Sequence, residues 1–140
     1  MKVYQKLASL IGAIENCNET LDNENSTDSA CKNADEWIER HQSSIDLILT
    51  MFPSGSGFDS GTNLEQLEKP FSTPERLVFK TSYHHMNENG YYDSWTDHVI
   101  TVTPSLQFGF NVKVSGKNRN DIKNYIAEMF SDILDKEVSL

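Results

Sequence analysis

Residues 82–95, with the sequence SYHHMNENGYYDSW, gather side chains that can do chemistry. The stretch holds two histidines, three tyrosines, a tryptophan and two acids. An imidazole titrates near neutral pH, so it can serve as a structural hydrogen-bond partner, a ligand contact or a general acid and base. Aromatic rings can stack on a planar ligand such as a nucleic acid base. We therefore consider a binding site, a catalytic site and a metal site for this stretch.

A metal site is the least favoured of the three. His84 and His85 are neighbours on a predicted strand, so their side chains point to opposite faces. The sequence has no His-x-His motif and no Glu-x-x-His helix that would supply a closed set of ligands. Cys17 and Cys31 are too few for a four-cysteine zinc site or a disulfide framework. We expect two reduced thiols, no metal and no cofactor.

The residues around this stretch predict a β-hairpin. Apolar and polar residues alternate before it, and Asn89-Gly90 is a pair favoured by two-residue type I′ loops. With that loop, apolar residues oppose apolar residues across the two strands. The predicted pairs are Leu77 with Val102, Phe79 with Ile100, Thr81 with His98, His84 with Trp95, and Glu88 with Tyr91.

One face of this hairpin is apolar near its base and polar toward its tip. The polar part carries Tyr83, His85 and, from the second strand, His98. Ligand sites combine apolar walls with a few placed polar groups, so we expect ligand contacts here. If the protein is an enzyme, His85 and His98 are its acid and base; structural hydrogen bonds are their alternative role. Tyr92 and Trp95 are candidates for stacking on a base, or for capping the hairpin.

A loop rich in glycine and serine, residues 53–63 with the sequence PSGSGFDSGTN, is a second candidate for ligand contact. Its backbone amides can form an anion-binding nest, with Ser54, Ser56 and Asp59 as side-chain contacts. A plain linker is the alternative. The loop is not a Walker motif, because no Gly-Lys-Ser/Thr follows. It is not a nucleophile elbow either, because GSGFD lacks the glycine that such an elbow needs two places before the serine.

The periodicity of apolar residues predicts a single α+β domain over residues 1–140. Apolar residues recur every three or four positions in two runs, which predict an antiparallel helical hairpin within 3–51. A three-stranded antiparallel meander follows over 76–115, and then a C-terminal helix over 120–137. The predicted order is α-α-β-β-β-α, with the helices covering one face of the sheet.

The charge of the chain restricts its partners. The formal net charge is -9, with 21 acids against 12 bases, so nonspecific binding to duplex nucleic acid is not expected. Eight acids accompany only Lys32 within residues 15–39, at the tip of the predicted helical hairpin. That tip is either a solvated surface or a surface offered to a basic protein. No membrane span or signal peptide is recognisable, so we expect a cytosolic protein.

Three runs of residues, PSGSGFD, HHMNENGYYDSWTDH and GKNRNDIKNYI, together resemble a family of small, largely uncharacterised bacteriophage accessory proteins that begin, as here, with YQKLASLIGAI. The resemblance covers most of the chain except the loop near residues 18–30, which is longer and more acidic here. Ser94 stands where the family has glycine. The resemblance implies a protein made in the cytoplasm of an infected bacterial host, and it transfers no catalytic residue.

Small phage accessory proteins commonly counter host defence, and this analogy leads to three functional hypotheses. The first is a module that binds and sequesters a nucleotide-derived immune signal, with phosphates held by Lys117 or Arg119. The second is an acidic inhibitor that docks on a host defence protein or nuclease. The third is a metal-independent nucleotide hydrolase. We favour the first, because the polar candidates lie beside an apolar wall. Exposed sheet edges also favour a homodimer.

Overall fold

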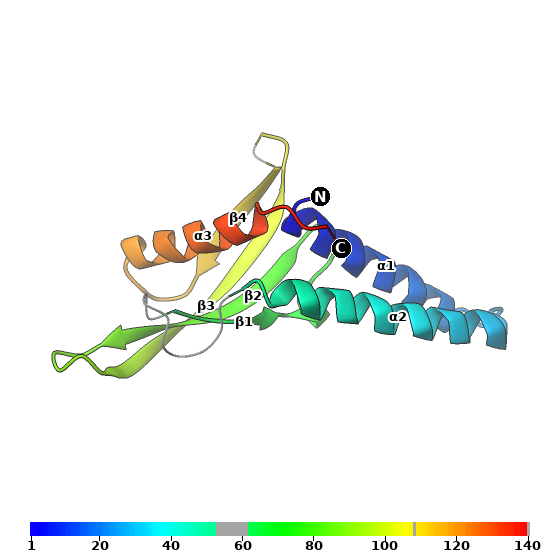
Figure 1. Cartoon of the computed structure of the whole chain (residues 1–140), viewed down its shortest axis with the longest axis horizontal. Coiled ribbons are helices and arrows are strands. Elements are labelled where there is room, and N and C mark those ends of the chain that lie inside the picture. Colours follow the sequence, from blue (N-terminus) through cyan, green and yellow to red (C-terminus); the bar gives the residue numbers. More distant parts are fainter. Residues whose placement is uncertain (53–61, 108, 140) are drawn as a thin grey trace.

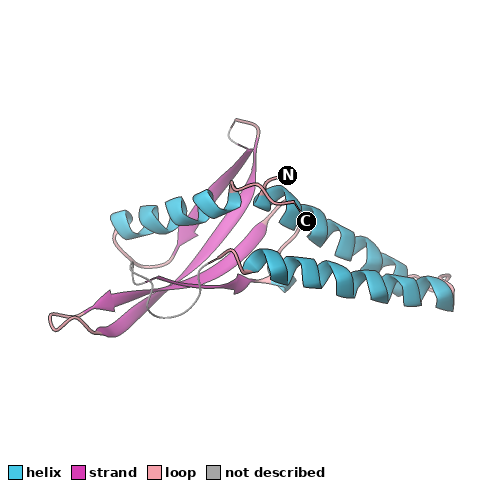
Figure 2. Cartoon of the chain, viewed as in Figure 1, coloured by secondary structure: helices cyan, strands magenta, loops and turns pink. Residues whose placement is uncertain are grey.

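The computed structural model describes residues 1–52, 62–107 and 109–139. These residues form three α-helices, four strands and one short 3-10 helix (Figures 1 and 2). The elements are α1 Val3–Asp22, α2 Asp28–Leu49, β1 Thr62–Leu67, the 3-10 helix η1 Lys69–Phe71, β2 Leu77–Met86, β3 Tyr92–Ser105, β4 Gly109–Ser115 and α3 Asn120–Leu134.

The sheet is antiparallel throughout, with the strand order β1-β2-β3-β4. Strands β2 to β4 are the predicted meander, so the α+β class and the order of two helices, three strands and a helix are confirmed. Strand β1 is an addition at the edge of the sheet, where Thr62 pairs with Tyr83. It includes the last two residues of the predicted Gly/Ser loop, and the rest of that loop, 53–61, lies outside the described residues.

The predicted register of the β2–β3 hairpin is confirmed from its base to His85. Leu77 opposes Val102, Phe79 opposes Ile100, Thr81 opposes His98, and His84 opposes Trp95. This register matters for the site, because it decides which side chains of both strands share a face of the sheet.

The predicted two-residue loop at the tip of the hairpin is wrong. The amide of Asn87 donates to the carbonyl of Tyr91 at 2.7 Å, which leaves three residues in the loop instead of two. A type I′ loop would also need a positive φ at Asn89, yet positive φ occurs among the described residues only at glycines, including Gly90 at 83°. An irregularity beyond His85 absorbs the difference, so the register below the tip is unchanged.

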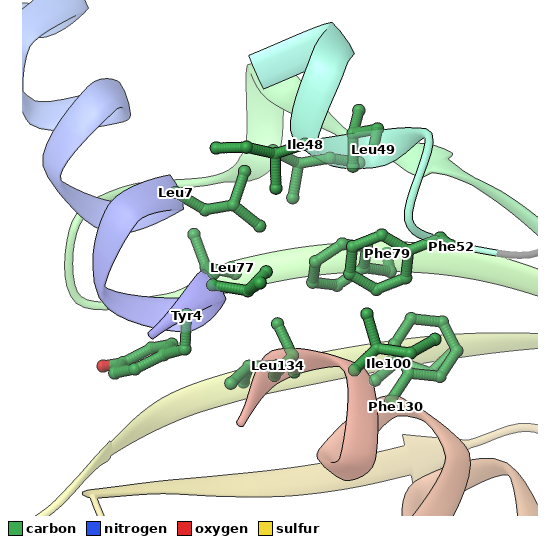
Figure 3. Close-up of a cluster of buried hydrophobic side chains, with 14 of the residues drawn as sticks. Tyr4, Leu7, Ile48, Leu49, Phe52, Leu77, Phe79, Ile100, Phe130 and Leu134 are labelled. Atoms are coloured by element: carbon green, nitrogen blue, oxygen red, sulfur yellow. The ribbon is translucent and has the colours of Figure 1, made fainter. Parts of the chain in front are cut away.

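The helices cover one face of the sheet and bury a single apolar core against it (Figure 3). At its centre the rings of Phe52, Phe79 and Phe130 lie within 5.2–5.9 Å of one another, centroid to centroid. Phe79 comes from β2, Phe130 from α3, and Phe52 follows α2, so this cluster joins three elements. The rest of the core surrounds it, including Leu7, Ile48, Leu77, Ile100 and Leu134.

The two ends of the chain pair with each other. The predicted C-terminal helix over 120–137 ends earlier, at Leu134, and the residues after it run beside the N-terminus. The amide of Val3 donates to the carbonyl of Lys136, and the amide of Val138 donates to that of Met1, both at 2.8 Å. The first of these bonds satisfies the amide of Val3, the first residue of α1, which the helix itself cannot pair.

The helical hairpin extends away from the sheet as an arm (Figure 1). The core residues of α1 all lie in its first half, up to Ile11, whereas in α2 the core begins only at Ile45. All eight acids between positions 15 and 39 are exposed on the outer part of this arm. Cys17 and Cys31 are half-buried free thiols there.

The aromatic cluster predicts a large effect of one core substitution. We expect Phe79→Ala to lower the free energy of unfolding by about 3–5 kcal/mol, because a buried ring is lost and a cavity remains. Leu106→Ala is the control, since Leu106 is fully exposed and should change stability by less than about 0.5 kcal/mol. Urea denaturation measures both, and similar values for the two variants would contradict the described core.

Candidate functional site

A hollow of about 490 Å³ lies between the outer part of the β2–β3 hairpin and the start of α3. Figure 1 shows α3 beginning over the part of the hairpin that leads to its tip. The lining residues are Tyr83, His85 and Met86 from β2, and Asn118, Arg119 and Ile122 from the start of α3.

Strand parity explains why Tyr83 and His85 face this hollow. They continue the face that carries Phe79 into the core, two and three alternations further along β2. At that distance the core ends, and Ile122 of α3 is its last buried residue beside the hollow. The hollow therefore combines the buried apolar side chain of Ile122 with the polar side chains of His85, Asn118 and Arg119.

Thr96 is the centre of a hydrogen-bond network beneath the hollow. Its Oγ1 lies 3.2 Å from Nε2 of His85 and 3.0 Å from Nε2 of His98. The amide Nδ2 of Asn118 donates to the same oxygen at 2.8 Å. On the other side of its ring, Nδ1 of His98 lies 3.1 Å from the carbonyl oxygen of Ser115. The network thus links β2, β3, the end of β4 and the start of α3.

The network divides the two candidate histidines into different roles. His98 is 1% exposed, both of its ring nitrogens have protein partners, and it does not line this hollow. His85 is half-buried and lines the hollow. The ring of Tyr83 meets it edge-on, with 5.2 Å between centroids. A mechanism that needs both histidines to reach one substrate is therefore not supported by this geometry.

Arg119 supplies the positive charge of the hollow. It is the N-cap residue of α3, and its backbone amide donates to Oδ1 of Asn118 at 2.8 Å. Its guanidinium Nε lies 3.3 Å from a carboxylate oxygen of Asp121, in a pair that is largely exposed on both sides. Such an exposed pair contributes little, so the guanidinium remains available to an anion that enters the hollow.

The other predicted contacts do not join this site. Tyr92 and Trp95 flank His84 on the opposite face of the hairpin, with ring centroids 6.1 and 6.4 Å from the imidazole. Lys117 is exposed and does not line the hollow. The remaining predicted contacts, Ser54, Ser56 and Asp59, lie outside the described residues.

The sequence analysis missed four residues of the site. Met86, Asn118 and Ile122 line the hollow, and Thr96 organises the network beneath it. Thr96 could have been found, because it lies two positions before His98 and therefore on the same face of β3. The position of Asn118 follows only from the packing of α3 on the sheet.

No protein-family model matches this chain, and no curated protein and no solved structure matches it either. Within the described part of the chain, no three His, Cys, Asp or Glu side chains gather in a way that could hold a metal ion. None of the described helices has the length and apolar character needed to cross a bilayer.

The backbone at Gly116 passes close to the ring of His98, and a substitution at this position tests whether that close approach is required. A Cβ at this position would lie 2.6 Å from both Nδ1 of His98 and the carbonyl oxygen of Asp97, and its φ is 118°. We expect Gly116→Ala to lower the free energy of unfolding by at least about 2 kcal/mol, through strain and overpacking. The measurement is chemical denaturation, with the His98 ring resonances recorded alongside.

Gly109→Ala is the matched control for this substitution. Gly109 also has a positive φ, 84°, but nothing lies within 4 Å of a Cβ built there. Gly109→Ala should lower the free energy of unfolding only by the backbone strain, about 1–2 kcal/mol, and should leave the His98 resonances unchanged. Equal losses for the two variants would show that the approach of Gly116 to His98 is unimportant.

Proposed function

We propose that this protein binds a nucleotide-type small molecule in the hollow between the β2–β3 hairpin and the start of α3. One observation carries the proposal: a single space of about 490 Å³ is lined by the ring of Tyr83, the hydrogen-bonded imidazole of His85 and the guanidinium of Arg119. This volume is within the range of small-molecule sites, about 300–1,000 Å³.

The lining residues suit the two halves of a nucleotide. The ring of Tyr83 offers a face against which a planar base can pack, and the imidazole of His85 stands at 62° to it, with its edge available for a hydrogen bond. Arg119 stands at the other side, on α3, where its guanidinium can hold a phosphate. Because Arg119 is also the N-cap of a 15-residue helix, the positive end of the helix dipole favours the same anion.

The biological role in this proposal rests on the resemblance to phage accessory proteins. Such a protein, made in the cytoplasm of an infected bacterium, would withdraw a nucleotide-derived immune signal by binding it intact. Sequestration needs affinity and no turnover, which agrees with a site that exposes one imidazole to the ligand and keeps the other buried. A nucleotide hydrolase that uses His85 and His98 together is accordingly the less favoured function.

An acidic inhibitor of a host defence protein or nuclease is the second candidate function. The observation that favours it is the exposure of all eight acids on the projecting arm. A basic partner would meet them through a contact that weakens as salt screens it. The homodimer predicted from the exposed sheet edges is compatible with either function.

A ligand screen tests the proposed function directly. The intact protein is heated with mononucleotides, cyclic mononucleotides and cyclic dinucleotides, and a ligand that binds the folded state raises the melting temperature by mass action. The bound molecule is then released by denaturation and identified by mass spectrometry. Recovery of the same molecule supports sequestration, recovery of a cleaved product supports a hydrolase, and no stabilisation by any nucleotide contradicts the proposal.

Two cationic residues two positions apart provide a matched pair of variants. We expect Arg119→Ala to weaken nucleotide binding about 5- to 10-fold, because a charge-assisted hydrogen bond to phosphate is lost. Lys117→Ala removes the same charge outside the hollow and should change affinity less than about twofold. Isothermal titration calorimetry measures both. Equal losses would mean that charge acts at long range and that Arg119 does not touch the ligand.

Trp95→Ala distinguishes the hollow from the opposite face of the hairpin. Trp95 is exposed beside His84, away from Tyr83 and His85. We expect this variant to bind the nucleotide as the parent does, whereas Tyr83→Ala should bind about tenfold more weakly through lost stacking. The reverse result in the same titrations would place the site on the face of Trp95.

A further inference from the structure

The hydrogen-bond network beneath the hollow begins at a backbone carbonyl oxygen, which can only accept a hydrogen bond. The carbonyl oxygen of Ser115 has no proton to donate, so Nδ1 of His98, 3.1 Å away, must carry the hydrogen. In the neutral imidazole, Nε2 of His98 is then unprotonated and needs a donor. The protonated nitrogen of a buried histidine is thus assigned by its backbone partner.

Two donors lie near Nε2 of His98, and their distances decide between them. The hydroxyl of Thr96 is 3.0 Å away, whereas the amide Nδ2 of Asn118 is 3.4 Å away. The same amide lies 2.8 Å from Oγ1 of Thr96, a much better hydrogen bond. The closer hydroxyl of Thr96 therefore donates its proton to His98, and one of the two amide hydrogens of Asn118 is donated to Thr96. At 3.4 Å the same amide makes at most a weak second hydrogen bond to Nε2 of His98.

The orientation of the Asn118 amide does not depend on these histidines. Its Oδ1 accepts a hydrogen bond from the backbone amide of Arg119 at 2.8 Å. A flipped side chain would place two donors against each other at this point. The nitrogen of Asn118 must therefore face Thr96.

The state of His85 follows from the rest of the network. The single proton of Thr96 is used by His98, so Thr96 can only accept from His85, whose Nε2 lies 3.2 Å away. In the neutral imidazole of His85, Nε2 then carries the hydrogen and Nδ1 does not. Within the described residues, Nδ1 of His85 has no hydrogen-bond partner and is not enclosed.

We infer that His85 acts as a hydrogen-bond acceptor in the hollow, and that the ligand group it meets is a donor. This inference rests on the proposed function and makes it more specific. For a nucleotide, the donor is an exocyclic amino group of the base, with the phosphate on Arg119. His85 selects the base, while Thr96 and His98 act as positioning residues that keep the hydrogen of the neutral imidazole on Nε2.

Nuclear magnetic resonance tests the assignment without any ligand. Long-range correlations between ring protons and ring nitrogens distinguish protonated from unprotonated nitrogens, in ¹⁵N-labelled protein at pH 8.5. We expect a protonated Nε2 on His85 and a protonated Nδ1 on His98. In Thr96→Val the preference of His85 should be lost, whereas Thr101→Val, on the opposite face of β3, should preserve it. A protonated Nδ1 on His85 in the parent protein would overturn the inference.

A pair of ligands tests the donor group itself. Adenosine 5′-monophosphate and purine riboside 5′-monophosphate differ by the 6-amino group and share the same phosphate. We expect the amino compound to bind about 3- to 10-fold more tightly, and the difference to disappear in His85→Phe. Equal binding to the parent protein would overturn this inference and leave the proposed function standing. If neither compound binds, both the proposed nucleotide-binding function and the inferred hydrogen bond to His85 are contradicted.

Discussion

The pairing register of β2 and β3 is the constraint on which the rest of the structure depends. A shift by one residue would turn Phe79 and Ile100 out of the core, so the register is held by hydrophobic burial at the base of the hairpin. The same parity then carries Tyr83, His85 and His98 to the face that α3 covers. Apolar contacts near the middle of the sheet thus position polar groups closer to its tip.

The buried imidazole of His98 connects this constraint to the helix. A polar ring in the interior costs free energy unless its hydrogen bonds are made, and here both nitrogens have partners. The partners come from β3 and from the end of β4, and Asn118 joins them from the start of α3. The approach of Gly116 leaves no room for a side chain beside the ring. This arrangement holds the start of α3 over the hairpin where the apolar core ends.

The hollow and the acidic arm lie in different parts of the molecule (Figure 1). The arm carries most of the excess negative charge on exposed side chains, which opposes the approach of long polyanions. The hollow is lined by one guanidinium and by the rings of Tyr83 and His85, which suits a small ligand with few charges. The two surfaces are therefore compatible with one protein that binds a small anion and avoids nucleic acid polymers.

Much of the fold was determined by the sequence alone. The helical stripes, the meander and the register of the β2–β3 hairpin follow from apolar periodicity, because burial of one face selects a single alignment of neighbouring segments. The placement of His84 and Trp95 on the face opposite His85 followed from the same alternation. These features depend on residues close in sequence or on a repeated pattern.

Only the tertiary structure decided which polar residues meet. Strand β1 pairs with the outer edge of β2, and a backbone hydrogen bond between Asn87 and Tyr91 closes a three-residue loop that the Asn-Gly signal did not predict. Asn118 reaches Thr96 across 22 positions of sequence, because α3 packs on the sheet through its apolar face. Hydrogen bonds between distant segments depend on that packing, and no local pattern specifies it.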